Sequence, residues 1–360
     1  NCLHVLPALR RLEEAFPDTL AVIGVNSPKY PAEQDDGSLA YAISRYEIRH
    51  PVVHDPELRI WHDYGIQAWP TLVFIDPRGR ILGHMPGEPE ADKLLTGIGE
   101  MLRRWRGAAP QPLPLQLSAE PQRRFHFPAE IRPVGCSGER KLWAIADSGH
   151  HQVVLCDDDG CEIRRFGRGR PGFLDLDGEG CAFNNPQGLC GDGQSIYVAD
   201  TGNHAIRRID LASGQVITLA GTGKRGSLLE DVVAGHDACL ASPWDVECWE
   251  GRVLFANAGT HQLGWLDLRS GTVGALAGSG EEDLTDGAPA EAHLAQPTGL
   301  ALDRASGTLY FVDSETSSVR TLCASGTGPV ETLVGAGLFE CGRRNGDFAQ
   351  ARLQHCRGIA

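Results

Sequence analysis

The stretch Ile196-Tyr197-Val198-Ala199-Asp200-Thr201-Gly202-Asn203-His204 is the most informative part of the sequence, because close copies of it recur along the second half of the chain. Each copy is a short apolar run that ends in Asp or Asn and is followed by a turn. Short apolar runs bounded by turn residues predict strands. The other copies are Leu142–Asp147, Val253–Asn257 and Leu309–Asp313.

A second repeated feature marks the start of each unit. Asn185-Pro186, Ser242-Pro243 and Gln296-Pro297 precede the apolar runs at intervals of about 54 to 59 residues, with Phe127-Pro128 as a first start and His355-Cys356 as a fifth. Each unit holds four short predicted strands, and the last ends in Gly. This pattern is typical of a β-propeller blade. Residues 123–360 therefore predict an incomplete propeller of four blades and the first strand of a fifth.

The first 106 residues follow a different, alternating α/β pattern. The run from Cys2 to Phe16 predicts a helix that Pro7 kinks. A buried strand, two further helices and a short strand follow: Leu20–Val25, Leu39–Tyr46, Pro51–Val53, and Pro56–Tyr64 with Asp55 as the N-cap.

The end of this region predicts a hairpin and a closing helix. The strand Ala68–Asp76 is entered through Trp69-Pro70-Thr71, turns at Gly79 and pairs with Ile81–His84, before a helix from Pro89 to Arg104. Residues 107–122 are rich in Pro and predict a semi-rigid linker.

The charge of the chain argues against a polyanion as partner. The formal net charge is −14, of which residues 1–122 carry −4 and residues 123–360 carry −10. Nucleic-acid binding relies on a positive surface. No apolar run is long enough to cross a membrane. We therefore expect neither a nucleic acid nor a membrane as partner.

The cysteines indicate a reducing compartment. There are eleven, an odd number, without the spacing of a disulfide framework and without a CxxC pair. We expect mostly reduced thiols, buried as small core residues, in a cytoplasmic protein.

Three histidines occupy one repeat position, which raises the question of a metal site. His151, His204 and His261 each follow the Asp or Asn by four residues, and Ser317 stands there in the fourth unit. Equivalent positions lie on separate blades, so we expect them to cap turns. The acidic runs 157–159 and 281–283 lack the alternating spacing of a calcium loop. We predict neither a metal nor a cofactor.

The ordered features of the first region resemble the thioredoxin-like fold, in its redoxin and TlpA branch. These features are Cys2 at a helix start, Pro7, the Trp69-Pro70-Thr71 loop and the closing hairpin and helix. The resemblance implies that Cys2 is the resolving thiol, whose nucleophilic partner would precede it by three residues, outside this sequence. It also implies that Pro70 is cis and that Trp69, Pro70 and Thr71 contact the substrate.

The phrase from Tyr197 to His204 is similar to the signature of NHL repeats. With the order of the two regions, the whole chain resembles the NHL repeat-containing protein 2 family, as a bacterial relative truncated at both ends. That resemblance implies six blades in the parent, of which about four are present, and a thioredoxin-like domain that lacks its first strands.

The resemblance implies a thiol–disulfide oxidoreductase in the intact parent, with a propeller that binds protein partners or disulfide substrates. Without the upstream cysteine, this stretch alone should show no dithiol turnover at Cys2. The alternative is a non-enzymatic interaction scaffold with a redox-inactive first domain, which the absence of that cysteine from the parent would favour. A propeller hydrolase or lyase with a channel metal ranks last, because the sequence shows no convergent set of ligands.

Overall fold

The computed structural model describes residues 2–104, 123–338 and 340–360, and it divides into two compact units, residues 1–122 and 123–360. Each unit is considered by itself. The predicted linker, 107–122, lies outside the described residues. Within the described ranges, no helix is long and apolar enough to span a membrane.

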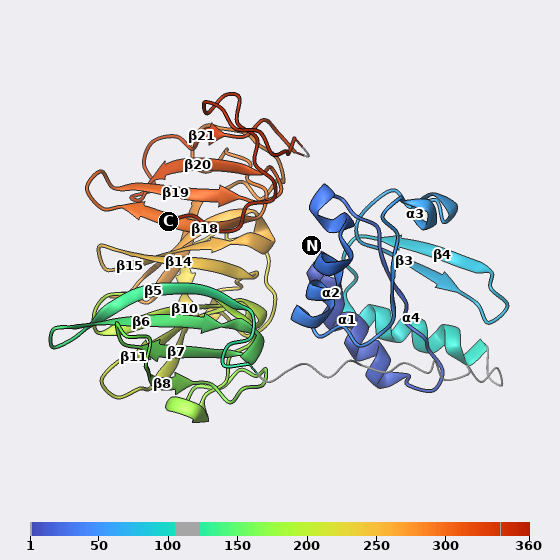
Figure 1. The fold of residues 1–360 in the computed structure, drawn as a ribbon, viewed down its shortest axis with the longest axis horizontal. Helices are drawn as coiled ribbons and strands as arrows, with labels where there is room; N and C mark the ends of the chain where they lie inside the picture. The colour runs from blue at the N-terminus through green and yellow to red at the C-terminus, as the bar shows by residue number, and fades with distance from the viewer. Residues whose placement is uncertain (1, 105–122, 339) are drawn as a thin grey trace. The chain divides into compact units, whose positions relative to one another are not determined.

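The first unit alternates helices and short strands, as its sequence pattern predicts (Figure 1). Strands β1 and β2 pair in parallel, and β3 and β4 form an antiparallel hairpin. The elements are α1 (Cys2–Ala15), β1 (Gly24–Asn26), α2 (Asp36–Arg45), β2 (Val52–His54), α3 (Arg59–Asp63), β3 (Thr71–Ile75), β4 (Ile81–Pro86) and α4 (Ala91–Arg104).

Several boundaries in the first unit differ from the prediction, most clearly those of the first strand and of the helix α3. The predicted buried strand Leu20–Val25 is wrong in both extent and burial. Strand β1 covers only Gly24–Asn26, the residues that pair with β2, and Ile23 and Val25 are 56% and 45% exposed. Helix α3 begins at Arg59 instead of Pro56, because Leu58 takes a left-handed conformation with φ 57°. Asp55 nevertheless serves this helix start: its carboxylate accepts the backbone N–H groups of Ile60 and Trp61 at 3.1 and 3.0 Å.

The core of the first unit lies between α1 and α4. Ala8 and Leu12 of α1 pack with Leu94 and Ile98 of α4, and all four are buried. Leu72 and Phe74 of β3 pack against this group. The apolar stripe of α1 therefore attaches the helix that begins at Cys2 to the rest of the unit.

The second unit is four antiparallel sheets of the propeller type, one for each predicted repeat (Figure 1). The blades, numbered 1 to 4 along the chain, are β5 (Pro128–Ser137), β6 (Arg140–Asp147), β7 (Gln152–Cys156), β8 (Glu162–Phe166); β9 (Pro186–Gly191), β10 (Ser195–Asp200), β11 (Ala205–Asp210), β12 (Val216–Ala220); β14 (Pro243–Trp249), β15 (Arg252–Asn257), β16 (Gln262–Asp267), β17 (Thr272–Ala277); and β18 (Pro297–Asp303), β19 (Thr308–Asp313), β20 (Ser318–Cys323), β21 (Glu331–Val334). The short strand β13 (Val233–Ala234) joins the outer edge of blade 3.

The propeller core lies between neighbouring blades. One apolar cluster joins blades 1 and 2, a second joins blades 2 and 3, and a third joins blades 3 and 4. The first strands β5, β9, β14 and β18 contact one another in sequence. Each blade thus buries its faces against the next, which is how a propeller forms its core.

The predicted first strand of a fifth blade is absent from the structure. Residues 355–360 have no strand, and the described residues after β21 contain only an isolated bridge between Arg344 and Arg352. A strand requires a hydrogen-bonded neighbour, and no later strand among the described residues supplies one. The segment still docks on blade 4, because a Cβ added to Gly299 would lie within 3.0 Å of the backbone of Arg357, Gly358 and Ile359.

Candidate functional site

The candidate redox site of the first unit begins with Cys2, the first residue of α1. The side chain of Cys2 lies outside what the structure describes, so its role as a resolving thiol stays a prediction. Pro7 lies inside the helix, as predicted.

The loop before β3 holds the other predicted site residues. The Trp69–Pro70 peptide bond is cis, the geometry that the resemblance implies. The Trp69 indole N–H donates to the Ser27 carbonyl at 2.8 Å, and the ring stacks on Trp61 with centroids 4.0 Å apart. Trp69 remains 40% exposed. The Thr71 hydroxyl instead donates to the Ala68 carbonyl at 2.7 Å, within the same loop.

A buried carboxylate supports this loop from behind. Asp55 accepts the Ser27 hydroxyl at 2.9 Å as well as the two N–H groups at the start of α3. Burial opposes its ionisation, but hydrogen bonds from the backbone of Trp61, Ile60 and Arg59 and from the Ser27 hydroxyl together place the pKa of Asp55 below its usual value. Ser27, Trp61 and Trp69 are therefore tied into one network. Sequence reasoning identified Asp55 only as a cap.

In the propeller, the three repeat histidines join neighbouring blades. The Nδ1 atoms of His151, His204 and His261 accept the backbone N–H groups of Asn185, Ser242 and Gln296 of the following blade at 2.9, 3.0 and 3.1 Å. The hydroxyl of Ser317 accepts the N–H of His355 in the same way, at 2.9 Å. The predicted capping role is thus refined, because the capped groups belong to the next repeat.

A second set of repeat residues completes each junction. The hydroxyls of Thr201 and Ser314 donate to the carbonyls of Pro243 and Cys356, both at 2.7 Å, and Ser148 donates to Pro186. Blade 3 has Ala258 at this position. Together with the histidine contacts, these hydroxyl contacts connect each blade to the next.

Blades 2 and 4 each contain a buried arginine between two aspartates. Arg207 pairs with Asp200 at 2.8 Å and Asp175 at 2.6 Å, and Arg320 pairs with Asp313 and Asp286. Burial raises the pKa of Asp200 and of Asp313 to about 6, although the guanidinium opposes the shift. Buried pairs of this kind fix the long loops before each blade.

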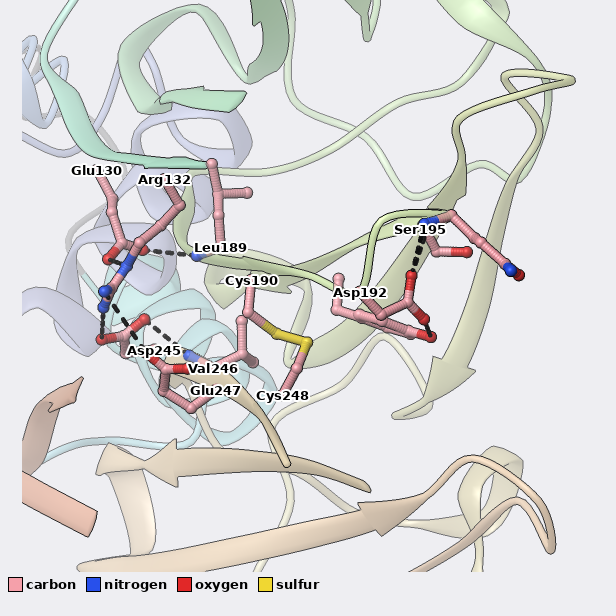
Figure 2. The surroundings of a disulfide bond; sticks show 12 residues. Glu130, Arg132, Leu189, Cys190, Asp192, Ser195, Asp245, Val246, Glu247 and Cys248 are labelled. Carbon is pink, nitrogen blue, oxygen red and sulfur yellow. Dashed lines mark hydrogen bonds and ion pairs between the residues drawn. A yellow bond between two sulfur atoms is a disulfide. The ribbon is translucent and has the colours of Figure 1, made fainter. Parts of the chain in front are cut away.

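A charged cluster lies where the first strands of the blades meet (Figure 2). Arg132 of blade 1 contacts Glu130 at 2.5 Å and Glu247 of blade 3 at 3.4 Å, and it lies 3.9 Å from Asp245. Burial raises the pKa of Glu130 and of Glu247, and burial together with the charge of Glu130 raises that of Asp245. The three acids are held in one network around Arg132.

Sequence reasoning missed this cluster. The signal was present in the repeats: the second and fourth residues after the starting Pro carry Glu130 and Arg132 in blade 1, and Asp245 and Glu247 in blade 3. Blades 2 and 4 have Gly188 and Gly299 at the first of these positions. At Gly188 an added Cβ would lie 2.3 Å from the Asp245 carboxylate. Gly188 therefore leaves room for the side chain of Asp245.

The cysteines depart from expectation in two ways. Cys190 and Cys248 form a disulfide, which the sequence did not predict. Of the unpaired cysteines among the described residues, only Cys156 and Cys181 are buried, whereas Cys136, Cys161 and Cys239 are exposed. Burial raises the pKa of Cys181 to about 11, so that thiol is the inert core residue that was expected.

Comparison with known proteins agrees with the repeats. The NHL repeat family model matches residues 183–209. NHL repeat-containing protein 2 of Gallus gallus is 37% identical over 393 residues, covering all of this chain and 54% of the relative. Protein SUPPRESSOR OF QUENCHING 1, chloroplastic, of Arabidopsis thaliana is 35% identical over 381 residues, covering all of this chain and 36% of the relative.

The first unit has a shorter match of its own. Thioredoxin-like protein YneN of Bacillus subtilis is 29% identical over 80 residues, covering 22% of this chain and 45% of that protein. The chain spans about half the length of the NHL repeat-containing protein 2 that it matches. By similarity along its whole length and by its NHL repeat, the chain belongs to the family of NHL repeat-containing protein 2.

Proposed function

We propose that the first unit is thioredoxin-like and performs thiol–disulfide exchange in the full-length protein, with the propeller binding its partners. The observation that carries the proposal is that Cys2 lies on α1, a helix that Ala8 and Leu12 pack into the core of the unit. In such a site a thiolate one turn earlier attacks the substrate disulfide, and the second thiol, here Cys2, resolves the mixed disulfide. The partial similarity to a thioredoxin-like protein supports this assignment.

The Trp69–Pro70–Thr71 loop is the proposed docking edge for the substrate. Trp69 is held by its bond to Ser27 and by Trp61, yet it exposes part of its ring. A rigid, half-exposed indole contributes contact area at low entropic cost. Trp69 therefore affects substrate affinity and leaves the reactivity of the thiols unchanged.

The test uses the full-length protein. Thiols are alkylated and counted before and after reduction, and the count is repeated with Cys2→Ser. We expect the wild type to contain a disulfide that Cys2→Ser abolishes. We also expect Trp69→Ala to raise KM for a protein disulfide while kcat remains near its original value. If Cys2→Ser has one thiol fewer than the wild type both before and after reduction, Cys2 forms no disulfide and the redox assignment is rejected.

A second candidate function is a non-enzymatic scaffold, and exposed apolar residues of the propeller favour it. Phe173, Leu174 and Leu176 lie in the long loop before blade 2 and are 41%, 37% and 46% exposed. Exposed apolar residues that gather in one loop often mark a protein-binding surface. Under this proposal, replacing Phe173 and Leu176 with Ser removes a bound partner while the thiol count stays the same.

A further inference from the structure

The disulfide lies at the contact between blades 2 and 3. Cys190 belongs to β9 and Cys248 to β14, the first strands of their blades, and their Cα atoms are 5.9 Å apart (Figure 2). This separation is within the range that a disulfide spans. The two cysteines are 58 residues apart in sequence, and both are buried, at 5% and 8% exposure.

The residues beside the two cysteines connect this bond to blade 1. Leu189 donates its N–H to the Glu130 carboxylate at 2.6 Å, and Glu247 pairs with Arg132. The positions of β9 and β14 therefore also determine the geometry of the charged cluster. A bond between Cys190 and Cys248 restrains three blades at once.

We propose that Cys190 and Cys248 are a reversible dithiol–disulfide site that locks blade 2 to blade 3 and exchanges with low-molecular-weight disulfides such as oxidised glutathione. In the oxidation, one protein thiolate attacks the small disulfide and releases one small thiol. The second protein thiolate then attacks the mixed disulfide and releases the other. Two protons pass from the protein to the two released thiols, and the protein loses two electrons.

The locked state differs from the reduced state in packing. Bonded sulfur atoms lie about 2.05 Å apart, whereas two thiols must separate to about 3.5 to 4.0 Å. Both side chains lie in the apolar cluster between blades 2 and 3, where little space exists for that separation. Reduction therefore loosens the contact between these blades. Burial also means that a reductant reaches the sulfur atoms only when the contact opens.

The proposal is independent of the proposed function, because it involves neither Cys2 nor the first unit. The experiment equilibrates the chain with oxidised or reduced glutathione, digests it without reduction and identifies the linked peptides. Thermal unfolding is recorded for both forms, with Cys156→Ala, a buried cysteine outside the bond, as the control. Cys190→Ala and Cys248→Ala are examined in parallel.

The expected result is a linked peptide pair that each of the two variants abolishes and Cys156→Ala retains. The oxidised protein should unfold at least about 5 °C above the reduced protein. Reduction by dithiothreitol should be about tenfold faster in 2 M urea than without urea, after correction for cystine treated in the same way. Equal unfolding temperatures for the two forms, or no link between these cysteines, would overturn the proposal. Because both forms are wild type, a variant that fails to fold does not affect this comparison.

Discussion

Each histidine at a blade junction accepts a backbone N–H of the next blade through its Nδ1 atom. His204 Nδ1 receives the N–H of Ser242 at 3.0 Å. Replacing His204 with Ala removes the acceptor and leaves a partly buried donor unpaired, so we expect a loss of about 1 kcal/mol in the free energy of unfolding. Urea unfolding measures the change.

The matched control for this substitution is His204→Asn. Asn tolerates the left-handed conformation of His204, φ 51°, and its amide oxygen can replace Nδ1. This variant should retain most of the stability that Ala loses. If Ala and Asn cost the same, the hydrogen bond contributes nothing and the histidines fill space only.

The buried aspartates give a pH dependence with a defined sign. The pKa of Asp200 is raised to about 6 in the folded chain, against about 3.9 in an unfolded one. Between these values the folded state binds a proton that the unfolded state does not. The contribution of Asp200 to stability therefore rises as pH falls from 7 towards 4.

This effect is measured as the difference in unfolding free energy between the wild type and Asp200→Asn, at pH 7 and at pH 5. The wild type should gain relative to the variant at the lower pH. The comparison cancels groups common to both proteins, including the histidines. If the difference in unfolding free energy is the same at both pH values, or if the variant gains relative to the wild type at pH 5, the raised pKa is contradicted.

At the scale of elements, the junction after blade 3 lacks the side-chain hydroxyl that the other three junctions have, so adding one there should raise the free energy of unfolding. Ala258 occupies the position at which Ser148, Thr201 and Ser314 donate to the next blade. Ala258→Ser supplies a hydroxyl at this buried site, and by analogy with the other blades its acceptor would be the carbonyl of Pro297. We expect a gain of about 0.5 to 1 kcal/mol in unfolding free energy.

The reciprocal substitution, Thr201→Ala, should lose a similar amount because it deletes an existing bond of 2.7 Å. Both variants are compared by urea unfolding at one pH. A loss with Ala258→Ser would show that the hydroxyl finds no acceptor, and that the four junctions are not equivalent.

Elements were predictable where the sequence repeats itself. The runs ending at Asp147, Asp200, Asn257 and Asp313 align four times, so each blade supports the assignment of the others. The strand expected at His355–Ile359 was wrong because a repeat-start motif does not form a strand without a hydrogen-bonded neighbour. Helix α3 was placed too early because the left-handed residue Leu58 carries no signal in the sequence.

Contacts between repeats were harder to predict. The disulfide joins Cys190 and Cys248, which are one position out of register when the starting prolines are aligned. The cluster around Arg132 requires the first strands of blades 1 and 3 to approach each other. Local periodicity reveals neither the Cys190–Cys248 bond nor the approach of these two strands, because both join residues far apart in sequence. The Trp69-Pro70-Thr71 loop, in contrast, was identified from a contiguous motif.

At the scale of the whole molecule, two units of different chemistry occupy one chain. The first carries Cys2 on helix α1 and the Trp69 indole, which is fixed by Ser27 and Trp61. The second has a repeated framework whose charged and hydroxyl groups connect its blades. The proposed roles follow this division, with exchange chemistry in the first unit and partner binding in the second.

The redox assignment of the first unit is tested most directly by the rate at which the full-length protein reduces insulin disulfides in the presence of dithiothreitol. This rate is measured for the wild type and for Cys2→Ser. The Cys190→Ala/Cys248→Ala double variant serves as the control for the propeller site. We predict that the wild type turns over insulin and that Cys2→Ser lowers this rate at least about tenfold, because it removes the resolving thiol. The double variant should keep the rate of the wild type. Equal rates for the wild type and Cys2→Ser would contradict the redox assignment and leave the scaffold as the function of the first unit.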